Sequence, residues 1–250
     1  MRKSLFLAVG CLLLLGGLVR AADETRAIID KAVKAHGGLE KLQKFKKSAT
    51  QMRAKGAVHE PIALDITMEA FAQDDNGKEV VEGEVAGQKF TQTVLMNGKT
   101  IRLYINGKEI KLDEKRLAAL AREKAHQKEV MDLVFADKKT GYKLSPLGEV
   151  KVNDKPAVGV QVSSEGYRDI NLFFDKASGL LVKTETRGKD LMRGGEEYTS
   201  ETVYDDFKKV EGVVVAHKVT IKRDGKRFVE GESTEVKLSE KLDDNVFEKP

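Results

Sequence analysis

The side chains best suited to catalysis or metal binding in this chain are its four histidines, which are His36, His59, His126 and His217. A zinc site on a helix needs two histidines four residues apart, on one face. No two of these histidines have that spacing. We therefore interpret His36 as a residue at the end of a helix and His217 as a hydrogen-bonded interior histidine. The sequence predicts no metal site.

Other reactive patterns are incomplete. Gly98-Lys99-Thr100 resembles the end of a phosphate-binding loop, which also needs a glycine where this chain has Thr93. Residues 74–77 have the oxygen-rich composition of a calcium loop without its alternating ligands. There is no Gly-x-Ser-x-Gly motif to hold a serine nucleophile. Acidic residues are plentiful, so a carboxylate pair that meets in space stays an open alternative. We nevertheless predict a protein that is not an enzyme and binds no cofactor.

The first residues carry a targeting pattern. Met1-Arg2-Lys3 is positively charged, residues 5–19 are almost all apolar, and Val19-Arg20-Ala21 offers small residues before a cleavage point. This pattern is typical of a secretory signal peptide, here residues 1–21. It predicts secretion across the inner membrane and a periplasmic location. A retained membrane anchor and a lipidated Cys11 are the two alternatives.

Removal of the leader lowers the net charge of the chain and takes away its single cysteine. The chain of 250 residues has a net charge of +4, and the leader contributes three basic residues and no acid, so the remaining residues 22–250 have a net charge of +1. Such a balance does not support nucleic-acid binding, which needs a basic face. Cys11 is the only cysteine, so no disulfide is available after cleavage. We predict one domain over residues 22–250, soluble and monomeric.

Hydrophobic periodicity predicts three helices. Residues 23–36 have a helical pattern that Asp23 can cap and that Gly37-Gly38 can end. A second, short helix follows from Leu39, with its lysines outward. A third should run from the cap Asp113 to about residue 136, and its narrow apolar stripe predicts a helix on a surface.

The rest of the chain reads as strands. From Ser48 onward apolar and polar residues alternate, which is typical of strands with one buried face. Glycine-containing turns separate them, for example Asp75-Asn76-Gly77 and Asn97-Gly98. No strand–helix–strand alternation occurs, so a parallel sheet is not expected. The fold class is therefore mainly β with a few helices (α+β), built as an antiparallel meander.

Four segments in this order resemble a known family. They are residues 35–42 (AHGGLEKL), 97–104 (NGKTIRLY), 173–183 (FFDKASGLLVK) and 242–250 (LDDNVFEKP). The chain resembles the LolA-like and LolB-like outer-membrane lipoprotein-sorting proteins. The resemblance implies an incomplete antiparallel β-barrel of about ten strands whose concave side is covered by helices and holds acyl chains. Relatives with this fold also include envelope-stress regulators that sense lipid or peptide.

A curved sheet with one apolar face must cover that face with helices, a second layer or a ligand. We predict that apolar side chains of the central strands line a hydrophobic ligand-binding cavity, namely Leu64, Ile66, Met68, Phe90, Val94, Met96, Ile101 and Leu103. The expected function is an extracytoplasmic carrier or sensor of lipids or lipoprotein acyl chains. The alternative is a non-catalytic envelope protein that binds another envelope protein and fills its interior with its own side chains.

Overall fold

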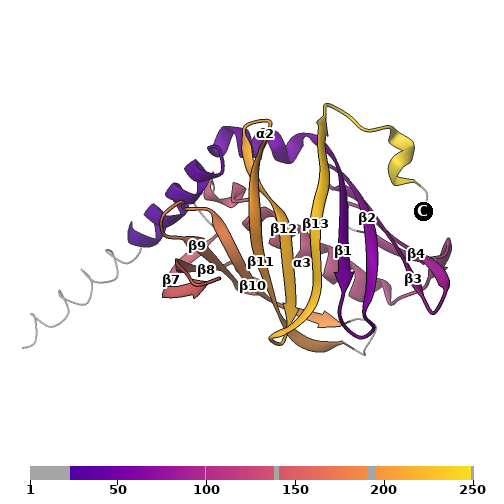
Figure 1. The fold of residues 1–250 in the computed structure, drawn as a ribbon. Coiled ribbons are helices and arrows are strands. Elements are labelled where there is room, and N and C mark those ends of the chain that lie inside the picture. Colours follow the sequence, from indigo (N-terminus) through magenta and orange to yellow (C-terminus); the bar gives the residue numbers. More distant parts are fainter. Residues whose placement is uncertain (1–22, 99, 138–140, 191–194, 249–250) are drawn as a thin grey trace, which may run out of the picture.

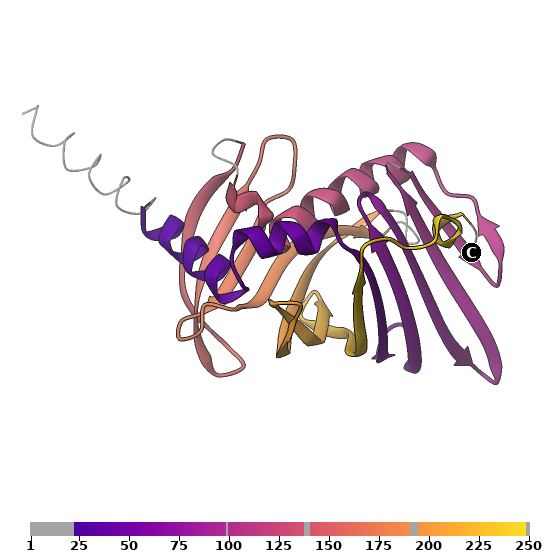
Figure 2. The same cartoon turned by 90° about the horizontal axis from the view of Figure 1, so that it is seen from above.

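The computed structural model describes residues 23–98, 100–137, 141–190 and 195–248. The signal peptide predicted for residues 1–21 lies outside the described residues. The described part contains one continuous antiparallel sheet, with the α-helices gathered on one side of it (Figures 1 and 2).

The sheet has thirteen strands where about ten were expected. Their bounds are β1 Ala49–Val58, β2 Leu64–Gln73, β3 Asn76–Val85, β4 Gln88–Asn97, β5 Thr100–Ile105, β6 Lys108–Ile110, β7 Lys143–Val152, β8 Lys155–Ser163, β9 Ile170–Asp175, β10 Leu181–Asp190, β11 Glu196–Val210, β12 Val213–Arg223 and β13 Lys226–Ser239.

The strand order makes the sheet an incomplete barrel. Strands that are consecutive in sequence pair with each other, except β6 and β7, and the first and last strands, β1 and β13, also pair. The free edges are β6 and β7, which stand at opposite ends of the strand order. The predicted fold class, an antiparallel meander forming an open barrel with helices, is confirmed.

The helical segments are residues 23–35, α2 Leu39–Lys47, α3 Glu114–Met131, and the 3-10 turns η1 Val134–Asp137 and η2 Asp244–Phe247. Asp113 caps α3 as expected, because its carboxylate accepts a hydrogen bond from the backbone N–H of Arg116 at 2.8 Å.

Two predicted boundaries were wrong. The third helix ends at Met131 and not near residue 136, because Leu133 takes a left-handed conformation with φ 59° that an α-helix cannot continue. The turn expected at Asp75-Asn76-Gly77 lies earlier, because Asn76 already belongs to β3 and pairs with Gln73. Asp74, with φ 52°, makes the reversal.

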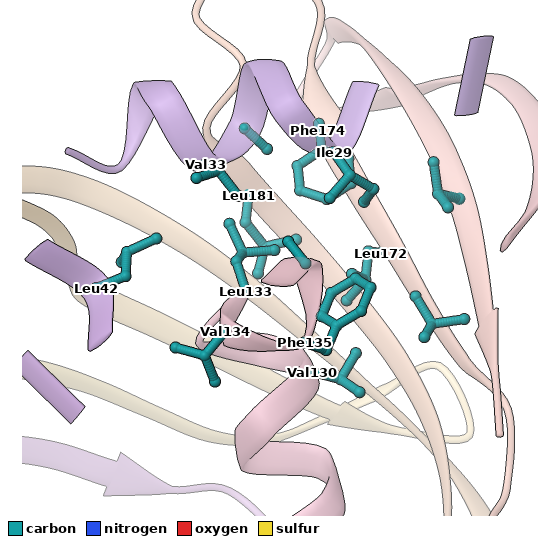
Figure 3. Packing of buried hydrophobic residues seen from close by; sticks show 14 of the residues in the cluster. Ile29, Val33, Leu42, Val130, Leu133, Val134, Phe135, Leu172, Phe174 and Leu181 are labelled. Atoms are coloured by element: carbon teal, nitrogen blue, oxygen red, sulfur yellow. The ribbon is translucent and has the colours of Figure 1, made fainter. Parts of the chain in front are cut away.

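The main hydrophobic core lies at one end of the sheet, between β8–β12 and the helices (Figure 3). The cluster includes Ile29 and Val33 of the first helix, Leu42 of α2, Phe135 of η1 and Leu172 of β9. Ile29 and Leu172 are fully buried. This packing fixes the helices on one face of the sheet, and burial of such side chains contributes about 1.5–3 kcal/mol each.

Candidate functional site: an apolar sheet surface beneath α3

The strand register identifies the surface of the sheet that α3 covers. The hydroxyl of Tyr204 on β11 lies 3.4 Å from the sulfur of Met131, the last residue of α3. Residues directly opposite each other in an antiparallel ladder point to the same face. The face of Tyr204 continues across seven strands through the row Tyr204, Val219, Gly231, Gly56, Ile66, Gly83 and Phe90. We call this face the helix-facing surface.

Every predicted cavity residue lies on the helix-facing surface. Ile66 and Phe90 belong to the row itself, and Leu64 and Met68 follow by alternation along β2. Alternation along β4 puts Val94 and Met96 on the same face as Phe90. Leu103 and Ile101 of β5 share that face, because they pair with Val94 and Met96.

Burial separates these residues from the main core. None of them belongs to the main core cluster. Ile101 is buried, with 7% exposure, whereas the other predicted residues are only half-buried. The two halves of the helix-facing surface therefore differ in burial. Over β8–β10 the apolar side chains are fully buried in the main core, whereas over β1–β5 most of them stay partly exposed to solvent.

Glycines shape this half of the surface. A β-carbon at Gly83 would come within 3.0 Å of both the Phe90 ring and the Leu64 side chain. These two predicted residues therefore both pack against the backbone of β3 at Gly83. Met96 likewise covers Gly77. Glycine in a strand interior allows this close approach and is common where a sheet bends strongly.

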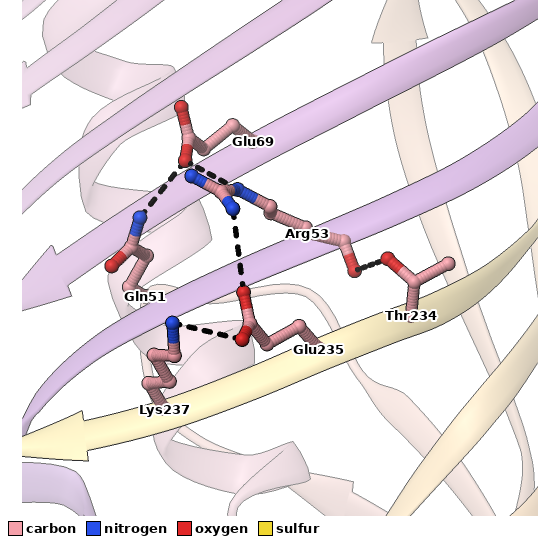
Figure 4. A network of polar contacts seen from close by, with 6 residues as sticks. All are labelled: Gln51, Arg53, Glu69, Thr234, Glu235 and Lys237. Carbon is pink, nitrogen blue, oxygen red and sulfur yellow. Dashed lines mark hydrogen bonds and ion pairs between the residues drawn. The ribbon is translucent and has the colours of Figure 1, made fainter.

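The opposite surface of the same strands is polar (Figure 4). Glu69 accepts hydrogen bonds from Gln51 and Arg53, each at 2.9 Å, and Arg53 also reaches Glu235 at 3.5 Å. The hydrogen bond from Gln51 is the main cause that holds the pKa of Glu69 below its usual range. Around Arg53 the outer side of these strands is therefore polar, whereas the helix-facing side of the same strands carries Met52, Ile66 and Met68.

Known proteins match this chain in structure but not in sequence. No protein-family profile matches the sequence, and no curated protein matches it significantly. A LolA superfamily protein from Nitrosomonas europaea is similar in structure, with 12% identity, a TM-score of 0.52, and coverage of 89% of this chain and 96% of that chain. A DUF1329 family protein from Desulfovibrio piger has 11% identity, a TM-score of 0.54, and the same coverage of 89% and 96%. The fold is LolA-like. At these identities the similarity establishes the fold alone.

An aromatic stack joins the second half of α3 to the residue that precedes β7 and to the loop between β8 and β9 of the LolA-like fold. The buried ring of His126 lies 4.0 Å from that of Tyr167 and is also stacked with Tyr142. The Tyr142 hydroxyl donates a 2.6 Å hydrogen bond to Glu129, and burial raises the pKa of that hydroxyl. Leu117, in the first half of α3, is only half-buried. The helix is therefore most deeply buried in its C-terminal half.

His36 joins the first helix to the LolA-like sheet. The backbone N–H of Leu181 donates to His36 Nε2 at 3.0 Å, so Nδ1 carries the proton and donates to the carbonyl oxygen of Val214 at 2.7 Å. Burial is the main cause that lowers the pKa of this imidazole. A neutral His36 therefore bridges the end of the first helix to β10 and β12.

The C-terminal segment lies against the outer surface. The backbone N–H of Leu242 donates to the Gln73 side chain at 2.8 Å. Phe247 of η2 lines a pocket of about 230 Å³ together with Leu95 and Arg102, which alternate with the predicted cavity residues and point the other way. Phe247 belongs to the ending that resembles the family's, and Pro250 of that ending lies outside the described residues.

The sequence did not reveal further apolar residues of the helix-facing surface. These are Met52, Val58, Val81, Val219, Ile221, Val229, Val236 and Leu238. The alternation of β13 is broken by a bulge opposite Arg53 and Ala54, so Val229 and Val236 share a face although their separation is odd. A pattern of strict period two could not find them together.

Within the described ranges, no group of three or more His, Cys, Asp or Glu side chains is arranged to hold a metal ion. No helix in the described part of the chain is long and apolar enough to cross a membrane.

Proposed function

We propose that this protein is an extracytoplasmic carrier or sensor of hydrophobic ligands, lipids or lipoprotein acyl chains, and that it acts in the cell envelope as a single domain. The observation that carries the proposal is the aligned, half-buried apolar half of the helix-facing surface, next to a core that is fully buried. The LolA-like fold, shared with a LolA superfamily protein from Nitrosomonas europaea, and the resemblance of the sequence to the lipoprotein-sorting family support this proposal.

The physical chemistry of such a site is simple. Each methylene group that moves from water onto the apolar surface contributes about 0.8 kcal/mol. A ligand with one long acyl chain therefore binds without any charged contact. Since α3 is most deeply buried in its C-terminal half, we expect its first half to move outward when the ligand enters or leaves. The predicted cavity residues then contact the chain, and no catalytic step is required.

The experiment uses the chain expressed with its own leader and purified under mild conditions. Lipids are extracted and identified by mass spectrometry, and uptake of a fluorescent fatty acid by the delipidated protein is measured. We expect a stoichiometric lipid or acyl species in the wild type. The variant Met68→Glu should fold and lose binding, because a carboxylate on the helix-facing surface makes acyl-chain burial unfavourable.

The neighbouring residue supplies the matched control. Thr67 is exposed and alternates with Met68 on β2, so Thr67→Glu adds the same charge to the outer surface. It should bind as the wild type does. Leu103→Glu repeats the test from β5. Unchanged binding in both Met68→Glu and Leu103→Glu would exclude this surface as the site. A wild-type protein that holds no lipid and takes up no fatty acid would instead favour a protein-binding module with a self-filled interior.

A further inference from the structure

His217 is a polar residue buried in the middle of the helix-facing surface. It lies on β12, two residues before Val219 of the row that defines the surface, and is only 9% exposed. Its Nε2 atom is buried and has no hydrogen-bond partner among the described residues. A buried polar atom without a partner is uncommon in native proteins, because it has lost its hydration without compensation.

The other ring nitrogen fixes the chemistry of this atom. His217 Nδ1 lies 3.4 Å from the carbonyl oxygen of Ser233 on β13. A carbonyl oxygen can only accept a hydrogen bond, so Nδ1 carries the proton in the neutral imidazole. Nε2 is then a lone acceptor, and its natural complement is a hydroxyl or amide N–H donor.

The position of His217 connects it to the predicted ligand site. Ser233 pairs with Ala54, and Ala54 pairs with Met68, so one cross-strand row on the helix-facing surface leads from His217 to Met68. The Ser233 hydroxyl also lies 3.3 Å from the sulfur of Met52 on the same surface. The imidazole thus lies on the same surface as Met52 and Met68, next to Ser233, and the Asp206 carboxylate is close enough to interact with it electrostatically.

Other polar residues of this surface do not share these properties. Glu79 pairs with Ala70 and Val94 on the helix-facing surface, but it is exposed and keeps its hydration. Among the polar side chains on this surface, His217 combines burial with an unused acceptor. A few precisely placed polar groups in an apolar site are what give such sites their specificity.

We infer that His217 Nε2 accepts a hydrogen bond from the ligand, and that the preferred ligand is an acyl chain or lipid carrying a hydroxyl or amide N–H donor within its apolar part. This inference rests on the proposed function and specifies the chemical class of the ligand. The lone pair of Nε2 makes this contact, and the ligand chain continues along the row toward Met68.

The test compares stearic acid with a set of monohydroxystearic acids that differ in the position of the hydroxyl. Binding to the delipidated wild type is measured by displacement of fluorescent cis-parinaric acid. A hydrogen bond of ordinary net strength predicts that at least one isomer binds about three- to tenfold more tightly than stearic acid.

The variant His217→Asn separates ligand recognition from a purely structural role. Its side-chain amide can still donate to the Ser233 carbonyl, but it has no group in the place of Nε2. We expect it to bind stearic acid like the wild type and to lose the preference for the hydroxylated isomer. His217→Leu, which removes both contacts, should lose the same preference and also some thermal stability.

The outcomes are distinct. If the wild type binds stearic acid and all hydroxylated isomers equally, or if His217→Asn keeps the preference, the inference is wrong while the carrier function stands. If neither stearic acid nor any isomer binds, the proposed function and the inference fail together.

Discussion

His36 Nδ1 lies 2.7 Å from the carbonyl oxygen of Val214, and this contact ties the end of the first helix to β12. The bond requires a neutral ring, because Nε2 accepts from the N–H of Leu181. One of the contacts that hold the first helix against the sheet therefore depends on the protonation state of His36.

Acidification should weaken this junction. Burial lowers the pKa of His36 in the folded protein, below its value of 6.5 in the unfolded chain. The unfolded state then binds the proton more readily, so this stabilisation is complete above about pH 6.5 and is lost as the pH falls through the folded-state pKa. Urea unfolding between pH 7.5 and pH 5 measures it.

The variant His36→Ala checks the assignment. It leaves the Leu181 N–H and the Val214 carbonyl without their partner, so we expect a loss of about 1–3 kcal/mol at neutral pH. Its stability should depend less steeply on pH than that of the wild type. Equal pH dependence of the two proteins would contradict the role of His36.

Two glycines that face each other across β1 and β13 should respond differently to the same substitution. A β-carbon at Gly56 would overlap the carbonyl oxygen of Glu230 and lie 3.1 Å from the Gly231 backbone, whereas at Gly231 the nearest such atom is 3.5 Å away. Gly56→Ala should cost about 1–3 kcal/mol because the strands must separate. Gly231→Ala should be neutral or slightly stabilising. Thermal unfolding of the two variants decides between these expectations.

The two halves of the helix-facing surface should differ in their sensitivity to truncation. Leu172 is fully buried in the main core, so Leu172→Ala should lower the free energy of unfolding by about 2–5 kcal/mol. Leu103 is half-buried, so Leu103→Ala should cost about half as much or less. Urea titrations of the ligand-free variants test this. Equal losses would show that the surface over β1–β5 is ordinary core.

The N-terminal cap of α3 can be tested separately. Asp113→Ala removes the acceptor for the Arg116 N–H and should cost about 0.5–2 kcal/mol. Asp113→Asn keeps an acceptor oxygen and should stay close to the wild type. Chemical denaturation followed by circular dichroism measures the difference. A larger loss in Asp113→Asn than in Asp113→Ala would show that charge, and not capping geometry, matters there.

The polar network on the outer surface should contribute little to stability or to fatty-acid uptake. Arg53 has 56% of its side chain exposed, and its ion pairs with Glu69 and Glu235 are screened by solvent. Arg53→Ala should therefore change stability by less than about 1 kcal/mol and leave fatty-acid uptake unchanged. A loss of uptake would mean that the outer surface takes part in ligand binding.

Much of the architecture was determined by the sequence, because local physical chemistry carries it. Alternation placed Leu64, Ile66 and Met68 on one face of a strand, and Asp113 marked the start of α3 through its capping oxygen. The helix boundary at residues 37 and 38 followed from glycine, whose N–H groups bond back to Lys34 and Val33. Each of these features depends on residues close together in the chain.

Only the tertiary structure decided which apolar residues form the core and which stay half-exposed. Leu172 and Leu103 have the same local pattern, yet Leu172 is fully buried in the main core and Leu103 is only half-buried. Alternation reports the face of a strand and not what covers that face. The pairing of β1 with β13, the bulge near Arg53 and the buried Nε2 of His217 arise from contacts between distant segments, which no local pattern encodes.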